Sequence, residues 1–256
     1  MASVLPGMVT SVGEIARRFI EAKIVRGELR PGEKVTEAQI ADELSISRSP
    51  VREAFSSLEA KGLLDQKPRR GFFVSDIDET YIWEIYTLQN QFYVLGLTLS
   101  WDRIGEKEIA ELEACVERME EIAELETCVE RMDEIAASNA AKIEEYQEIN
   151  HRFHLIPIIL SGHQRLLRHA NDYNAHVKRL SYMNIVNEVS HLGNSAAFHR
   201  QIFEAIRSRD LDGSVQLIHQ HVHKGLEVHL ARYGKQIPER TESEKQENQQ
   251  DREYKR

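Results

Sequence analysis

Cysteine is scarce in this chain of 256 residues, which contains only Cys115 and Cys128. Two cysteines do not make the disulfide framework of a small secreted domain. If both lie on one helix, they are about 20 Å apart along its axis, which excludes a bond between them. We therefore expect a protein of the reducing cytoplasm.

Long apolar runs and a targeting segment are lacking as well. The longest apolar run covers residues 155–160, whereas a transmembrane helix needs about 20 apolar residues. Residues 1–12 lack the charged and apolar regions of a signal peptide. No membrane partner is therefore expected.

Positive charge is in short supply, because 33 lysines and arginines face 42 acidic residues, a net charge of −9. Such an acidic excess argues against nucleic-acid binding unless the basic residues gather in one part of the chain. The first 75 residues carry 12 basic and 10 acidic side chains, net +2, and the remainder carries 21 and 32, net −11. This distribution predicts a mildly basic N-terminal unit and an acidic C-terminal unit that repels duplex.

Residues 37–74 carry the pattern on which the functional interpretation depends. Apolar residues at helical spacing predict one helix over residues 37–44 and a second that ends at about residue 61. Ser47 is placed to cap the second helix and Gly62 to end it. Apolar residues on both sides of a basic tip then predict a two-stranded hairpin. A helix over residues 11–26 should pack against this unit as its third helix.

The polar side of the second helix begins with residues suited to DNA. Arginine can bond O6 and N7 of one guanine, and serine hydroxyls and free helix N–H groups suit phosphates. A helix N-terminus of this kind lies in the major groove in helix-turn-helix proteins. Each residue alone could belong to a solvated helix face, but the joint pattern favours double-stranded operator DNA. The predicted contacts are Ser47, Arg48, Ser49 and Arg52 on the helix, with Arg69, Arg70 and Gly71 in the wing.

The segments SRSPVREAFSSLEAKGLL and PRRGFFV resemble the winged helix-turn-helix of the GntR superfamily of transcriptional regulators. The resemblance places that family's base- and phosphate-contacting positions on the same seven residues. There is one departure, because some members have an arginine early in the first helix of the motif, where this chain has Ala38. That contact should be absent here, and operator preference should differ.

From residue 79 to about residue 233, apolar residues repeat at helical spacing throughout. The expected fold class is mainly α, with a winged helix-turn-helix in residues 1–75 and an all-α bundle of six or seven helices in residues 76–236. Residues 237–256 are polar and charged, with almost nothing to bury, and are predicted to be disordered.

A tandem duplication lies within the bundle, where ELEACVERMEEIA in residues 111–123 is followed by ELETCVERMDEIA in residues 124–136. On a straight helix, 13 residues rotate the second copy by about 220° relative to the first. Both copies therefore cannot bury the same face. One copy is predicted to extend or bulge the helix towards solvent, without a function of its own.

Histidines occur on the inward faces of three predicted bundle helices, at His154, His199 and His221. Asn150 lies one turn before His154 on the same face. Neutral imidazole is a good ligand for zinc and other transition metal ions, so these side chains can converge on one divalent ion. Because a lone buried histidine is usually only hydrogen-bonded, spacing alone leaves a purely structural role open.

The segments NHRFHLIPIILSGHQRL, HRQIFEAIRSRD and IHQHV resemble the FCD effector domain of FadR-type GntR regulators. The resemblance implies a divalent metal ion, with zinc expected first and nickel or manganese as alternatives. It maps the family's metal ligands onto Asn150, His154, His199 and His221. The first of these is usually aspartate. An asparagine oxygen can still coordinate but brings no negative charge, so metal affinity should be lower.

Family members that bind small carboxylates often have Arg-x-x-Leu-Glu in the first effector helix, where this chain reads Gln-Asn-Gln-Phe-Tyr in residues 89–93. A fixed cation is missing there, which weakens the case for a carboxylate effector. The expected pocket contains Gln89 and Tyr93, with Arg152 or Arg179 as a substitute cation. An ordinary surface position is the alternative for each arginine.

Together these features predict a metabolite-responsive transcriptional repressor and not an enzyme. A homodimer joined through the helical domain would bind a near-palindromic operator, and a small-molecule effector near the metal would change its DNA affinity. Two alternatives stay open. One is an effector-independent DNA-binding protein with a structural helical domain. The other is a metalloenzyme fused to a DNA-binding module, since a three-histidine metal site can activate water.

Overall fold

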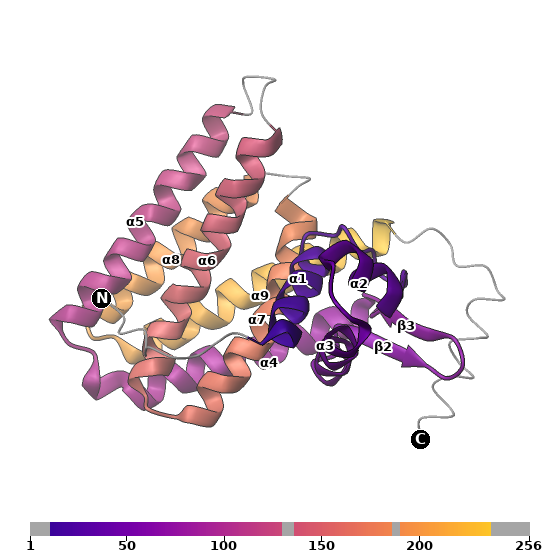
Figure 1. The fold of residues 1–256 in the computed structure, drawn as a ribbon. Helices are drawn as coiled ribbons and strands as arrows, with labels where there is room; N and C mark the ends of the chain where they lie inside the picture. The colour runs from indigo at the N-terminus through magenta and orange to yellow at the C-terminus, as the bar shows by residue number, and fades with distance from the viewer. Residues whose placement is uncertain (1–10, 130–135, 186–189, 237–256) are drawn as a thin grey trace.

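The computed structural model describes residues 11–129, 136–185 and 190–236. Within these residues the chain is mainly helical, with one small antiparallel sheet towards its N-terminal end. Figure 1 shows a winged head, made of the elements within residues 12–74, beside a longer helical body that begins at residue 79. The mainly α fold class expected from the sequence is confirmed.

Three helices build the head because each buries one apolar face against the others. They are α1 (Val12–Val25), α2 (Glu37–Leu44) and α3 (Arg48–Ala60), of which the last two form the predicted helix-turn-helix. Ser11 and Thr36 cap the first two helices, because their side chains accept hydrogen bonds from backbone N–H groups of the first turn. The shared core consists of fully buried side chains: Ala16, Ile20, Ile40, Val51, Phe55 and Leu58.

A three-stranded sheet forms the wing, in the order β1-β3-β2. Its strands are β1 (Lys34–Val35), β2 (Leu64–Lys67) and β3 (Gly71–Val74), all paired antiparallel. The prediction of two strands was wrong in missing β1. Two residues are too short to show an alternating pattern, and their pairing with Phe72 and Phe73 joins positions far apart in the sequence.

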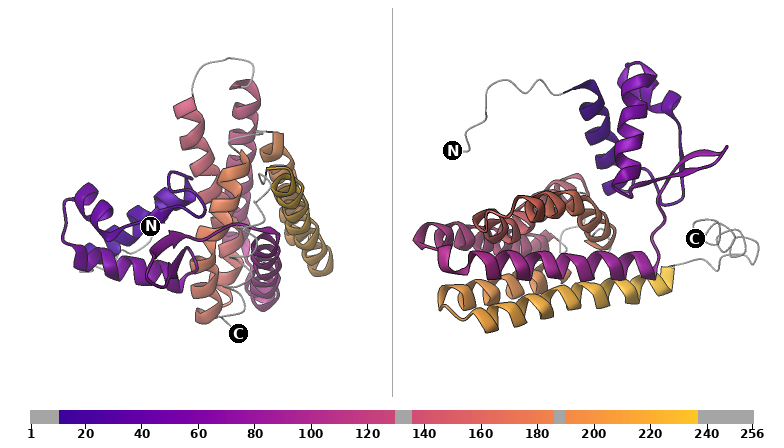
Figure 2. Two further views of the ribbon diagram at one scale, coloured as in Figure 1. Left: turned by 90° about the vertical axis from the view of Figure 1, so that its right-hand side faces the viewer. Right: turned by 90° about the horizontal axis from the view of Figure 1, so that it is seen from below.

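The body consists of long helices with short connections. Its elements are α4 (Glu79–Ser100), η1 (Trp101–Arg103), α5 (Glu106–Val129), α6 (Ala136–Leu160), α7 (Gln164–Ile185), α8 (Ser190–Arg207) and α9 (Leu211–Gln236). Asp78 caps α4 by accepting a hydrogen bond from the Tyr81 N–H, at 2.8 Å. Helix α4 packs against α6, α7 and α9, and Figure 2 shows α4 and α9 lying side by side.

The tandem duplication falls at the α5–α6 hairpin. The first copy packs inward through Leu112, Val116, Met119 and Ile122, all fully buried. The second copy continues α5 as far as Val129, after which residues 130–135 lie outside the described part. The solvent-facing orientation of the second copy therefore stays a prediction, and the expected disordered tail also lies outside the described residues.

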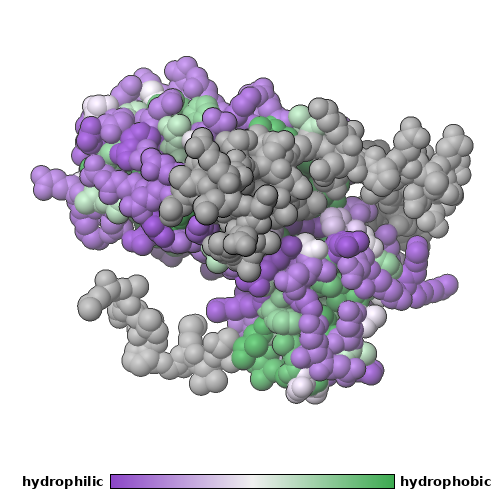
Figure 3. Space-filling view, turned by 90° about the horizontal axis from the view of Figure 1, so that it is seen from above, coloured by the Kyte–Doolittle hydropathy of each residue, from purple (hydrophilic) through white to green (hydrophobic). Residues whose placement is uncertain are grey.

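Polarity differs between the two units in the view of Figure 3, where the body is mainly hydrophilic and hydrophobic residues gather on the head. Exposed apolar side chains also occur on the body, chiefly along α4. None of the described helices combines the length and apolar character that a membrane crossing needs.

Candidate functional site

The predicted DNA-contacting residues of the helix lie exposed at the N-terminal end of α3. Ser47, Arg48 and Ser49 form the first turn, and Arg52 follows one turn later on the same side. Ser47 occupies the N-cap position but makes no capping hydrogen bond to the described backbone. Its hydroxyl and the first N–H groups of α3 therefore point to a place where a phosphate could bind.

Arg52 is held in place by an acidic residue of α2. Its Nε and Nη2 donate to the two carboxylate oxygens of Glu37, each at 2.9 Å. The Arg52 hydrogen bonds keep the pKa of the Glu37 carboxyl below its ordinary value. This paired geometry fixes the plane of the guanidinium before any contact with DNA.

The wing tip adds further cations. Arg69, Arg70 and Gly71 are all exposed, and Arg69 and Gly71 have positive φ values of 63° and 97°. This turn conformation projects the tip between β2 and β3, and Figure 2 shows the hairpin pointing away from the body. The seven residues predicted to contact DNA therefore lie on exposed edges of the head, and the body does not cover them.

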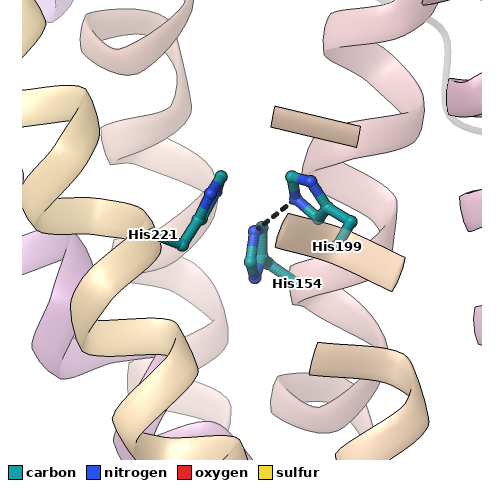
Figure 4. Close-up of side chains that lie close together, drawn as sticks. All are labelled: His154, His199 and His221. Carbon is teal, nitrogen blue, oxygen red and sulfur yellow. Dashed lines mark hydrogen bonds between the residues drawn. The ribbon is translucent and has the colours of Figure 1, made fainter. Parts of the chain in front are cut away.

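Three histidines from different helices meet inside the body. His154 lies on α6, His199 on α8 and His221 on α9, and one ring nitrogen of each lies within 4.8 Å of the others. The Nε2 atoms of His154 and His199 are 3.0 Å apart, and Figure 4 shows the His221 ring beside this pair. The structure thus brings together the three histidines that the sequence singled out.

The environment keeps these imidazoles neutral. Burial lowers the pKa of His199 to about 4, and burial also holds the pKa values of His154 and His221 well below the ordinary value. His199 Nδ1 donates to the carbonyl oxygen of Ser195 at 2.7 Å, which leaves its Nε2 lone pair facing His154. Tyr93 stacks on the His154 ring with 3.8 Å between centroids.

These observations fit a metal ion. Two zinc–nitrogen bonds of about 2.1 Å at the tetrahedral angle place their nitrogens about 3.4 Å apart, so the 3.0 Å between the Nε2 atoms of His154 and His199 would need to widen by only about 0.4 Å to admit the ion. Neutral imidazoles whose other nitrogen is hydrogen-bonded are the form that metals bind. Asn150 lines the same cavity as His221.

A cavity of about 600 Å³ adjoins the histidine cluster at His221, and its size is typical of small-molecule sites. Its walls come from α4, α6, α7, α8 and α9. The lining combines amides, hydroxyls and aromatic rings: Tyr86, Gln89, Tyr146, Gln147, Asn150, Ser181, Ser195, Phe198, Gln201 and His221. Sequence reasoning named Gln89, Asn150 and His221 among these, and it missed Tyr86, Tyr146, Gln147 and Gln201, because helical spacing alone does not show which side chains meet at a cavity.

The four residues expected in the effector pocket separate into two pairs. Gln89 lines the cavity, and its Nε2 donates to the Tyr93 hydroxyl at 2.7 Å. Arg152 lies outside on α6, two-thirds exposed, with a guanidinium nitrogen 4.0 Å from Glu111. Arg179 is fully buried, and its Nη2 donates to the Ser75 carbonyl oxygen at 2.6 Å. Neither arginine lines the cavity of about 600 Å³.

Helix α7 joins the body to the head. His176 Nε2 donates to the carbonyl oxygen of Lys61, directly after α3, at 2.7 Å. The Lys61 ammonium lies 3.0 Å from Asp172 of α7, and Arg179 holds the linker at Ser75. The same helix lines the cavity through Val177 and Ser181. No pattern in the sequence predicts this junction.

Comparison with known families assigns both units. Residues 13–74 match the bacterial regulatory proteins of the gntR family, and residues 94–224 match the FCD domain. The second match alone covers about half of the chain.

Individual relatives agree with this assignment. The chain is 28% identical over 222 residues to the uncharacterized HTH-type transcriptional regulator YdhC of Bacillus subtilis. The aligned region covers 85% of this chain and 91% of the relative. It is 23% identical over 205 residues to the HTH-type transcriptional repressor RspR of Escherichia coli, covering 80% and 83%.

Solved structures share the fold. McbR/YncC of E. coli superimposes with a TM-score of 0.69 at 16% identity, covering 87% of this chain and 99% of that one. A GntR regulator from Rhodococcus sp. RHA1 gives a TM-score of 0.66 at 18% identity, covering 86% and 98%. With a winged head, an FCD body and regulators among its relatives, this chain belongs to the GntR family of DNA-binding transcriptional regulators, in its FCD branch.

Proposed function

We propose that this regulator is a metabolite-responsive repressor whose helical body binds a divalent metal ion and a small effector. The observation that supports this most directly is the cluster of His154, His199 and His221 beside the cavity, on the same body that contacts the end of α3. A ligand in the cavity contacts α7, and α7 contacts the head. Binding of the effector would thereby shift the position of the head and the affinity for operator DNA. The similar protein RspR is named a transcriptional repressor, which supports the same direction of control.

The operator would be read by α3 and contacted by the wing. Arg48→Ala and Arg52→Ala should each lose about 1–3 kcal/mol of discrimination between operator and unrelated duplex, because each removes a fork-shaped donor. The measurement is fluorescence anisotropy with an operator selected from random duplexes, at fixed salt. Arg30→Ala is the control, since it removes an exposed head cation outside the α3 edge. Full selectivity in either α3 variant would contradict this role.

The metal would be held by His154, His199 and His221, with Asn150 as a neutral fourth ligand. When bound, the ion would supply a Lewis-acidic position that can hold an effector oxygen. Among the described residues that line the cavity, none carries a carboxylate that could act as a general base. This absence argues for a ligand seat over a hydrolytic centre.

Elemental analysis tests the metal directly. The purified full-length protein should hold about one divalent ion per chain, most readily zinc, and His199→Ala should release it. His223→Ala is the matched control, because His223 is an exposed histidine of α9, two residues beyond His221. Wild-type protein that holds no metal after dialysis against zinc would contradict the proposal.

The dimer would form through α4. This helix exposes Leu88, Leu95 and Leu99 at spacings of seven and four residues, each more than 40% exposed, with Trp83 on the adjoining surface. Such a stripe matches the seam of a helix pair, and a second copy of the same helix supplies the complementary surface under two-fold symmetry. A symmetric dimer would then place two heads on a near-palindromic operator whose half-sites are about one turn or less apart.

A further inference from the structure

The side chains that line the cavity indicate which chemical class of ligand it can bind, and membership of the family does not. Hydrogen-bonding groups without charge dominate it, with the amides of Gln89, Gln147 and Gln201, the hydroxyl of Ser181 and the phenols of Tyr86 and Tyr146. Among the described lining residues there is no arginine, aspartate or glutamate. A ligand that forms many neutral hydrogen bonds matches this surface.

The single lysine of the described lining is a poor anchor for an anion. Lys224 is 61% exposed, and its ammonium lies 3.2 Å from the Glu227 carboxylate. A carboxylate deep in the cavity would therefore meet no fixed side-chain cation, and burying an unpaired charge is costly. A metal at the histidines could hold one carboxylate, but a second carboxylate on the same ligand would have no partner.

Gln89 contributes a buried polar atom without a described partner to the cavity wall. Its side chain is buried and bonded to Tyr93 through Nε2, and its Oε1 has no hydrogen-bond partner within the described part of the chain. An amide can be turned about, so the free atom is either an acceptor or a donor. A ligand hydroxyl satisfies both orientations because it donates and accepts, whereas a carboxylate only accepts.

We propose that the effector is a polyhydroxylated molecule of sugar or polyol type, and that its hydroxyl groups, not its carboxylates, carry the affinity. This inference rests on the proposed function, since it concerns the same cavity. The phenol rings of Tyr86 and Tyr146 and the ring of Phe198 give apolar walls for the carbon skeleton. A volume of about 600 Å³ accommodates a six-carbon chain with its hydroxyls.

Three six-carbon compounds distinguish binding through hydroxyl groups from binding through carboxylates. Sorbitol carries only hydroxyls, glucarate carries four hydroxyls between two carboxylates, and adipate carries two carboxylates alone. Isothermal titration of the zinc-loaded full chain should rank them sorbitol, then glucarate, then adipate, with adipate at least tenfold weaker than sorbitol. The inference is overturned if adipate binds as tightly as sorbitol, if glucarate binds tenfold more tightly than sorbitol, or if none of the three binds.

Variants locate the binding. Gln89→Leu should weaken sorbitol binding about tenfold, and Lys224→Met should change it less than twofold. If Gln89→Leu fails to fold by circular dichroism, Ser181→Ala at the cavity wall takes its place, with a smaller loss expected. Equal losses in the cavity variant and in Lys224→Met would overturn the inference.

Metal content and operator binding of the same samples distinguish this inference from the function on which it rests. Protein that holds zinc and binds operator but prefers adipate refutes the ligand class alone. Protein that holds no zinc and binds no operator selectively refutes the proposed function itself.

Discussion

His176 shows how one residue can make a stability contribution that depends on pH. Its Nε2 donates to the Lys61 carbonyl oxygen, and its Nδ1 accepts from the Tyr81 hydroxyl at 2.6 Å. The bond from Tyr81 requires the neutral ring with its proton on Nε2, because a protonated Nδ1 cannot accept. Burial between head and body lowers the pKa of His176 to about 4. The folded protein therefore resists protonation of a group that protonates readily once the chain unfolds.

The sign of the effect follows from the lowered pKa. Above about pH 6.5 the ring is neutral in both states, and as the pH falls towards 4 only the unfolded state gains the proton, so folding loses free energy. Between pH 7 and pH 5 the loss should be about 2 kcal/mol from this residue. Urea unfolding at both pH values should show that His176→Phe reduces the pH-dependent loss by that amount. His169→Phe, an exposed position on the same helix, should leave it unchanged.

Individual residues differed in how well the sequence placed them. The three histidines and the α3 arginines were predicted because helical spacing assigns each to a face. His176 and Arg179 were not assigned to the junction, since their partners Lys61 and Ser75 are more than 100 positions away. No local period carries that information, and the same holds for Gln147, whose place in the cavity wall depends on how α6 meets its neighbours.

Helices were predicted well where apolar residues repeat at helical spacing over several turns. Helices α1 and α2 begin and end within one or two residues of their predicted bounds, and α4 begins at the predicted residue 79. Caps at Ser11, Thr36 and Asp78 explain these starts. Helical periodicity predicts helix starts at residues 141 and 195, whereas α6 begins at Ala136 and α8 at Ser190, five residues earlier in each case. The first turns of these helices contain few large apolar residues, so periodicity gives no signal there.

The α5–α6 hairpin carries the clearest prediction at this scale. The first copy of the duplication already supplies the buried side of α5 through Leu112, Val116 and Met119. Figure 1 shows the ends of α5 and α6 extending beyond the other body helices. Deleting residues 124–136 should therefore shorten the hairpin and change the melting temperature by less than about 4 °C, corresponding to roughly 1 kcal/mol. A large drop in melting temperature would show that the second copy packs into the core.

At the scale of the whole molecule, α7 connects the head with the cavity of the body, two features that the sequence patterns predict separately. One side carries Asp172 and His176 against the end of α3, and Ala175 belongs to the hydrophobic core of the head. The other side lines the cavity through Val177 and Ser181. A shift of α7 by a bound ligand would therefore reach the recognition helix through one rigid element, with no longer path required.

In a dimer, a shift of α7 would change the spacing of the two heads. The proposed control of operator binding therefore requires the proposed α4 seam. Under two-fold symmetry each protomer contributes one Leu95 side chain to the seam, so one substitution changes two side chains there. Leu95→Glu should therefore raise the dimer dissociation constant at least a hundredfold, about 2.7 kcal/mol. Light scattering coupled to size exclusion should find the variant monomeric where the wild type is dimeric. Its binding to a single half-site should persist while binding to the full operator weakens. Ile15→Glu, an equally exposed apolar position on α1, should remain dimeric, and a dimeric Leu95→Glu variant would refute the α4 seam.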